Sequence, residues 1–171
     1  MLTNDQLVGL LDQWDVHFLT GGTALPQAQE IDPAQLLAAL AMSDEARLRL
    51  AIIPLLLRHP EIVLELPLTM EQLPAAAQIV LKCYYTAAYL LQQKYQSRLQ
   101  ALFAYFPALP NRFGNELGLQ PLQSVDEQLA ALAQCQRVLS GRSINWLGTY
   151  EHGAERLLRY YEQKQKWHRS Q

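Results

Sequence analysis

Apolar residues recur every three or four positions along most of this chain, which is the spacing of one face of an α-helix. The first such row consists of Leu7, Leu11, Trp14 and Phe18. Thr3 and Gln6 stand just before it with the spacing of a capping box, in which two side chains satisfy backbone N–H groups at a helix start. The pattern predicts a first helix from about Asn4 to Leu19.

Two further helix starts follow in the next part of the chain. Asp32 can cap a helix whose first residue is Pro33, and Ser43 can cap a third helix ahead of two acidic residues. Pro54 must kink or interrupt the third helix, because proline lacks the backbone N–H and its ring clashes with the carbonyl four residues earlier. That helix ends at His59, where another proline follows.

The longest apolar row runs from Ala77 to Phe106 and repeats about every 3.6 residues, which predicts one fairly straight helix. At ~1.5 Å per residue this helix would be roughly 45 Å long. It can start at a capping box of Thr69 and Gln72, or restart at Pro74 after a short turn. A second apolar row on the same helix indicates that it is central and packed on two sides.

Turn-forming residues fill the stretch 107–121, which has no helical period and predicts a compact surface loop. Ser124 and Glu127 then form another capping box, and Gly141 ends the helix that follows. The last helix is expected to begin near Ser143. Its inward row is Leu147, Tyr150, Ala154, Leu157 and Tyr161.

Together these elements predict an all-α fold, a single-domain bundle of six or seven helices around one long central helix, over residues 1–171. Half of the residues are apolar, enough for one sizeable core. The longest apolar run has eight residues, in LAIIPLLL, whereas a membrane-spanning helix needs ~20. The start of the chain also lacks the pattern of a signal peptide, so we expect a cytoplasmic protein with no membrane partner.

Charge is unevenly distributed along the chain although the net charge is only −2. Residues 1–75 carry ten acids and three bases, and residues 76–171 carry six acids and eleven bases. The only cysteines, Cys83 and Cys135, are too few for a disulfide framework and too far apart for a CxxC site. Both lie on apolar helix rows, which predicts small core residues.

One stretch, FLTGGTALPQAQEID, resembles the glycine turn and paired acids of nucleotidyltransferases. Only seven residues separate Gly22 from Glu30, too few for the helix that joins these parts, and Pro33 prevents strand pairing beyond Asp32. Asp32 is already explained as a helix cap. We therefore expect no metal-dependent chemistry here.

The other candidate groups for chemistry are scattered. The four histidines form neither an HExxH nor a paired ExxH pattern, so no metal site and no cofactor are predicted. No arginine precedes a histidine by five to seven residues, the arrangement of helical ribonuclease toxins of the higher-eukaryote-and-prokaryote nucleotide-binding type. An enzymatic role is therefore disfavoured, and no catalytic residue is assigned.

The blocks EARLRLAIIPLLLRHPE and NWLGTYEHGAERLLRYYE resemble parts of uncharacterised prokaryotic all-helical proteins. Such proteins accompany minimal nucleotidyltransferases in two-gene modules. The resemblance covers about a third of the chain and transfers no site residue. It implies a helical partner or regulator of another protein.

The outward row of the long helix is the first candidate interaction surface. It contains Lys82, Tyr85, Tyr89, Gln92 and Gln96, with no acidic residue between Gln72 and Asn115. Tyrosine together with depletion of charge is typical of interface cores. Tyr85 and Tyr89 would anchor a protein partner or a second copy, unless another part of the same chain covers the row.

The last helix carries the second candidate surface. Its basic face comprises His152, Arg156, Arg159 and Lys166, with Trp167 nearby for stacking on bases. The spacing of Glu155 to Arg159 and of Glu162 to Lys166 also fits ion pairs on a solvated helix. We therefore expect a non-enzymatic interaction or regulatory protein, with an RNA-binding or RNA-acting helical protein as the alternative.

Overall fold

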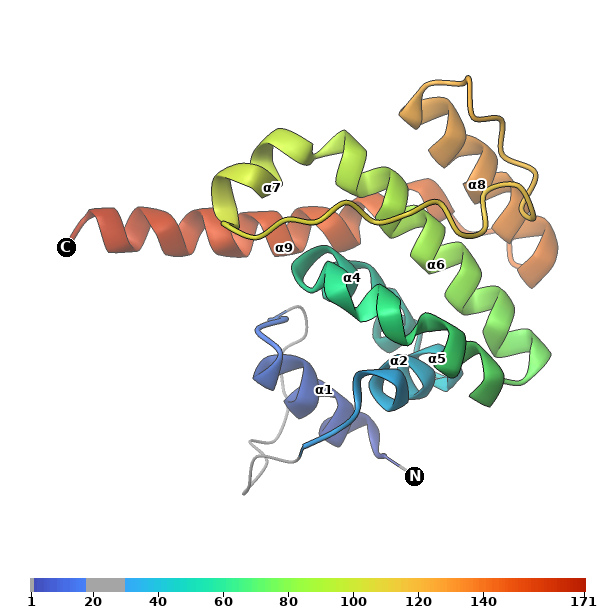
Figure 1. Cartoon of the computed structure of the whole chain (residues 1–171), viewed down its shortest axis with the longest axis horizontal. Coiled ribbons are helices and arrows are strands. Elements are labelled where there is room, and N and C mark those ends of the chain that lie inside the picture. The colour runs from blue at the N-terminus through green and yellow to red at the C-terminus, as the bar shows by residue number, and fades with distance from the viewer. Residues whose placement is uncertain (1, 18–29) are drawn as a thin grey trace.

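The structure is a computed structural model that describes residues 2–17 and 30–171, and within these ranges it contains helices and no strand. The all-α prediction is therefore confirmed. In chain order the elements are α1 (Asn4–Gln13), α2 (Pro33–Met42), α3 (Ala46–Leu50), α4 (Ile52–Arg58), the 3-10 helix η1 (Pro60–Glu65), α5 (Leu66–Gln72), α6 (Ala75–Lys94), α7 (Gln96–Leu102), α8 (Val125–Ser140) and α9 (Trp146–Arg169) (Figure 1).

Several helix starts are those that the sequence predicts. Thr3 forms its capping box with Gln6, and the Asp32 carboxylate accepts a hydrogen bond from the Ala34 N–H. Ser124 likewise caps α8, and Gly141 ends α8 in the left-handed conformation with φ of 68°. These side chains satisfy backbone groups that have no partner within their own helix.

The end of α1 and the starts of two later helices differ from the predictions. Helix α1 ends at Gln13 rather than near Leu19, because Asp15 adopts a φ of 58°, and residues 18 and 19 lie outside the described ranges. Ser43 follows α2, and the N-cap of α3 is Glu45. Thr69 lies inside α5, where its hydroxyl donates to the carbonyl of Glu65, so it caps no helix.

The predicted interruption near Pro54 and the predicted helix end at His59 are both confirmed. The predicted third helix divides at Ala51 into α3 and α4, with Pro54 in the first turn of α4, where its missing N–H leaves no helical bond unmade. His59 then ends α4. Pro74 is the N-cap of α6. Of the two predicted starts for the long helix, the restart at Pro74 after a short turn is therefore the correct one.

The long central helix is shorter than predicted. Helix α6 ends at Lys94, and Tyr95 leaves helical geometry with φ of −105° and ψ of 22° before α7 begins. Its 20 residues span ~30 Å. Helix α6 nevertheless packs on α2, α4, α8 and α9, and it crosses the middle of the molecule in Figure 1.

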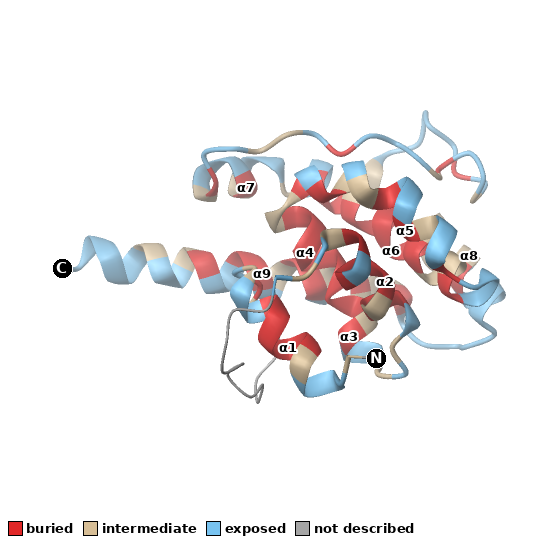
Figure 2. Ribbon diagram, turned by 60° about the horizontal axis from the view of Figure 1, so that its bottom comes forward, coloured by how far each residue is buried: buried red, intermediate tan, exposed pale blue. Residues whose placement is uncertain are grey.

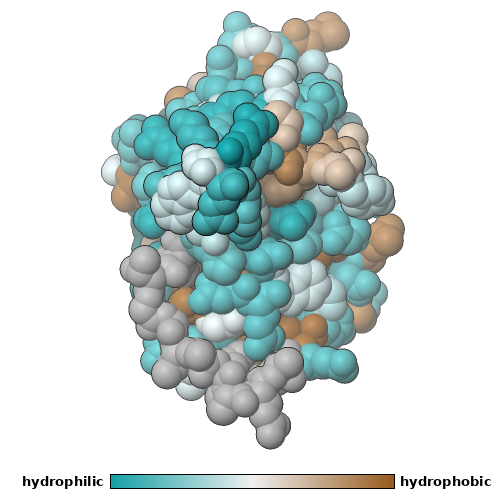
Figure 3. Space-filling model, turned by 90° about the vertical axis from the view of Figure 1, so that its left-hand side faces the viewer, coloured by the Kyte–Doolittle hydropathy of each residue, from teal (hydrophilic) through white to brown (hydrophobic). Residues whose placement is uncertain are grey.

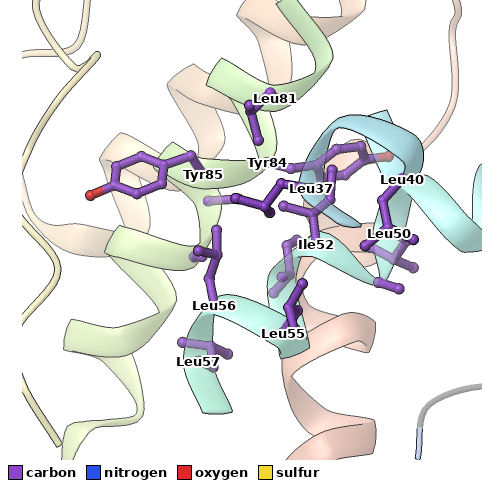
Figure 4. Packing of buried hydrophobic residues seen from close by; sticks show 14 of the residues in the cluster. Leu37, Leu40, Leu50, Ile52, Leu55, Leu56, Leu57, Leu81, Tyr84 and Tyr85 are labelled. Atoms are coloured by element: carbon purple, nitrogen blue, oxygen red, sulfur yellow. The ribbon is translucent and has the colours of Figure 1, made fainter. Parts of the chain in front are cut away.

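The core is built mainly where α2, α4 and α6 meet. Figure 2 shows that buried residues line the facing sides of these helices, and Figure 4 shows their side chains interdigitating. Members of this cluster include Leu37, Leu40, Ile52, Leu55, Leu56 and Leu81. Each fully buried leucine or isoleucine stabilises the fold by roughly 1.5–3 kcal/mol through removal of its apolar surface from water.

Candidate functional site

The predicted interaction row on α6 lies against another segment of the same chain. Tyr85 is fully buried, its hydroxyl donates to the carbonyl of Pro110 at 2.7 Å, and its ring meets Phe113 edge to face at 5.5 Å. In Figure 4 its ring leaves α6 in the opposite direction from that of Tyr84. Tyr85 thus anchors the loop that follows α7, and its burial excludes an external partner while that loop stays in place.

Gln92 holds the same loop about two turns further along α6. Its Nε2 donates to the carbonyl of Pro107 at 2.9 Å, and its Oε1 accepts from the N–H of Leu109 at 2.7 Å. The side chain is almost fully buried. These two hydrogen bonds hold the loop against α6, and we call Gln92 the latch of the loop.

The remaining members of the row differ in their surroundings. Lys82 pairs with Glu116 of the loop, and Tyr89 is partly buried against the core. Gln96 is exposed at the start of α7. The row that was expected to receive a partner is therefore largely occupied by residues 107–118 of its own chain, which corrects the prediction for Tyr85 and Gln92.

The basic residues of the last helix lie on its solvent-facing side. His152, Arg156, Arg159, Lys166 and Trp167 are all exposed, and they extend along α9 for more than four turns. The predicted inward row is buried except for Leu147, which is partly buried. The sequence therefore placed the two faces of this helix correctly.

The acids of α9 are bound in a way that the sequence does not predict. Arg98 of α7 donates to both carboxylate oxygens of Glu162, at 2.8 and 3.0 Å, and to Glu155 at 2.7 Å. Its hydrogen bond lowers the pKa of the Glu155 carboxyl below the ordinary value, and the two carboxylates raise the pKa of the guanidinium.

Only one of the two ion pairs expected within α9 forms. Glu155 meets Arg159 at 3.3 Å, as its spacing predicts. Glu162 is engaged by Arg98, and Lys166 forms no ion pair with any residue in the described ranges. The charge of Lys166 near the end of α9 is therefore not offset by an ion pair with a described carboxylate.

The end of α9 extends beyond the body of the molecule (Figure 1). Tyr161 is the last core residue of this helix, and its hydroxyl donates to the carbonyl of Asp15 at 2.5 Å. Gln165 still reaches the carbonyl of Ala101 at 3.2 Å, but residues 166–171 are all exposed. Figure 3 views the molecule from this side and shows mostly hydrophilic side chains there.

Two aromatic side chains interrupt this hydrophilic end. Trp167 is 64% exposed. Tyr160 lies about two turns before it on the same side of α9, and the centroid of its ring is 4.9 Å from that of the His17 ring. A shallow hollow of about 290 Å³ is lined by Tyr160, Gln163, Lys164, Trp167, His168 and Gln171. We call the first five of these residues the distal α9 surface.

No cluster of metal-binding side chains is found in the described ranges. Asp32 acts as a helix cap, as predicted, and the two glycines 21 and 22 lie outside these ranges. Residues 2–17 and 30–171 contain no group of three His, Cys, Asp or Glu side chains arranged to hold a metal ion. None of the described helices is both long and apolar enough to cross a membrane.

Both cysteines are free thiols; Cys83 is buried, as predicted, whereas Cys135 is only partly buried, so the prediction of a core residue is wrong for Cys135. Burial raises the pKa of Cys83 to about 12, and burial also raises the pKa of Cys135 above its ordinary value. Both therefore remain protonated near neutral pH, which disfavours nucleophilic chemistry.

Comparison of the chain with models of protein families, with curated proteins and with solved structures finds no match.

Proposed function

We propose that this chain is a non-enzymatic helical interaction protein, the partner or regulator of another protein in a prokaryotic module, and that it binds that protein through the distal α9 surface. The observation that carries the proposal is the exposed Trp167 on a helix end that contributes nothing to the core. The resemblance of two sequence blocks to helical partners of minimal nucleotidyltransferases supports the same class of role.

The distal α9 surface has the chemistry of a protein contact. Trp and Tyr contribute much of the binding energy at interfaces, because each offers a large apolar area together with a polar tip. Lys164 and His168 flank Trp167 on the same helical face and supply the polar rim of such a surface. An acidic partner would complement the positive charge at this end.

Energetics also favour a role outside folding for the last turns of α9. A helix in a small domain is stabilised chiefly by packing of its apolar face, and isolated helical turns are marginal in water. Packing by described residues ends at Tyr161 and Gln165. A partner that covers Trp167 would supply the packing that these turns lack.

The test compares three tagged full-length chains in affinity purification from the native host, each with and without nuclease treatment. The chains are wild type, Trp167→Ala, and the control Tyr105→Ala, which removes an aromatic side chain that is 72% exposed outside α9. We expect a specific protein to be recovered with wild type and the control but not with Trp167→Ala, regardless of nuclease. Equal recovery with all three chains would overturn the proposal.

A second candidate function, RNA binding, is favoured by the network around Arg98. Because Glu162 is engaged by Arg98, it does not neutralise Lys166, and the face from His152 to Lys166 keeps a cationic excess. In this case the affinity for a labelled RNA would fall steeply with salt, since counterions are released on binding.

The RNA candidate is tested by changing Arg156, Arg159 and Lys166 together to Gln. Loss of three phosphate contacts would reduce the slope of log affinity against log salt by about 2 for single-stranded RNA. Binding that is absent, or that has the same salt slope in the variant, would exclude this function for the basic face.

A further inference from the structure

A cavity of about 650 Å³ lies between the end of α2, the start of α6, the end of α8 and the start of α9. It is separate from the distal α9 surface, because only the first residue of α9, Trp146, reaches it. Apolar side chains form much of its wall, among them Ala41, Ala77, Val80 and Leu139. Its volume is in the range of sites that bind small molecules.

The floor of the cavity contains Tyr84, whose hydroxyl has no hydrogen-bond partner among the described residues although its side chain is only 2% exposed. Every fully buried side-chain nitrogen or oxygen in the described ranges does have a partner. The hydroxyl must therefore reach accessible space, and the cavity is the space that Tyr84 lines. Burial raises the pKa of Tyr84 to about 12, so this hydroxyl is a neutral donor near pH 7.

Gln136 provides a second unpaired polar group in the same cavity. It is only 3% exposed, and its Oε1 accepts a hydrogen bond from the buried hydroxyl of Tyr150. Its Nε2 has no partner in the described part of the chain, so it too must reach the cavity that Gln136 lines. Both donors therefore face the cavity, where they are available to a hydrogen-bond acceptor of a bound molecule.

The charged groups at the cavity are cationic. Arg49 and Arg142 line it, neither forms an ion pair with a described residue, and none of its lining residues is acidic. Arg49 is positioned by its hydrogen bond to the carbonyl of Ser43 at 2.6 Å. Guanidinium groups bind carboxylates well because their planar array of N–H donors matches two oxygen acceptors.

We propose that this cavity binds a small amphipathic anion, an apolar molecule that carries one carboxylate. The carboxylate accepts hydrogen bonds from Arg142, the Tyr84 hydroxyl and the Gln136 amide, and the apolar body packs on the wall formed by α2 and α6. The arginines and the two unpaired donors favour a negatively charged group, and the apolar wall favours a ligand with an apolar body. This site goes beyond the proposed partner binding and does not depend on it.

The first test is calorimetric titration of the full chain with octanoate, with 1-octanol and with acetate as matched probes. We expect octanoate to bind about tenfold more tightly than 1-octanol, because charge-assisted hydrogen bonds are roughly twice as strong as neutral ones. Acetate, which lacks the apolar body, should show no measurable binding. Equal binding of octanoate and 1-octanol, or no octanoate binding at millimolar concentration, would overturn the proposal.

The second test locates the binding with variants. Arg142→Gln should weaken octanoate binding about tenfold, and Tyr84→Phe about threefold with an unchanged melting temperature, because the lost hydroxyl has no protein partner. The control Arg137→Gln removes the same charge from α8 outside the cavity and should bind as wild type. Ala76→Phe, at an exposed lining position, should fill the cavity and abolish binding. Wild-type affinity in Arg142→Gln and Ala76→Phe would contradict the assignment.

Discussion

Replacing Gln92 should release the loop that crosses α6. In the native structure both ends of the Gln92 amide are bonded in a buried setting, to the carbonyl of Pro107 and the N–H of Leu109. The variant Gln92→Met keeps the length of the side chain but leaves both backbone groups without partners. Each buried group that loses its partner costs roughly 1–3 kcal/mol.

The loop limits this cost, because it can move away and expose the two backbone groups to water. We therefore expect Gln92→Met to destabilise the closed loop by about 2–3 kcal/mol. Tyr85→Phe, which removes only the hydrogen bond to Pro110, should cost about 1 kcal/mol. Comparing the two free-energy costs shows whether Gln92 or Tyr85 contributes more to holding the loop closed.

Limited trypsin digestion measures the opening directly, because Arg112 lies in the loop and is exposed. When opening is fast relative to cleavage, the cutting rate follows the population of the open loop. A change of 2 kcal/mol then increases cleavage after Arg112 about 30-fold, since 1.4 kcal/mol is a factor of ten. Cleavage after Arg142, outside the loop, is the internal control. Unchanged cleavage after Arg112 in Gln92→Met would refute the latch.

Three further predictions follow from individual contacts. In native protein at pH 8, iodoacetamide should leave Cys83 unmodified, because burial raises the pKa of its thiol to about 12, and mass spectrometry should find it labelled only after unfolding. Arg98→Gln should cost about 1 kcal/mol at pH 7 in urea denaturation. The folded-state pKa of Glu155 is lowered, so the part of this cost due to Glu155 should be present above about pH 4.5. It should disappear as the pH falls through the lowered pKa. A cost that does not change with pH would contradict the ion pair between Arg98 and Glu155. Asp32→Ala should lower stability by ~1 kcal/mol, and calorimetric titration with Mg²⁺ should detect no tight binding to either protein.

Helix starts and buried rows could be predicted from the sequence because their causes are local. The capping boxes at Thr3 and Ser124 need only side chains three residues apart, and the inward row of α9 needs only the helical period. The break at Tyr95 could not be predicted, because the apolar period continues across it. After the break, α7 contacts α9, and Arg98 of α7 bonds to Glu155 and Glu162, contacts between segments far apart in the sequence.

The interaction row on α6 shows the same limit at the level of function. A charge-poor row with two tyrosines has the same sequence pattern whether another protein covers it or a loop of the same chain does. Tyr85 and Gln92 form hydrogen bonds with backbone groups of Pro107, Leu109 and Pro110, and every residue type offers a backbone carbonyl, so such partners leave no signal in the sequence. The cavity at Tyr84 could not be predicted for a related reason, since its donors come from segments far apart in the chain.

Hydrogen–deuterium exchange of the chain, alone and in the complex recovered by affinity purification, tests the central claim most directly. Alone, the amides of residues 163–169 should exchange fast, because the end of α9 has little packing beyond Gln165. In the complex the same amides should be strongly protected. Protection confined to other parts of the chain, with residues 163–169 exchanging as fast as before, would contradict the proposal that the distal α9 surface binds the partner.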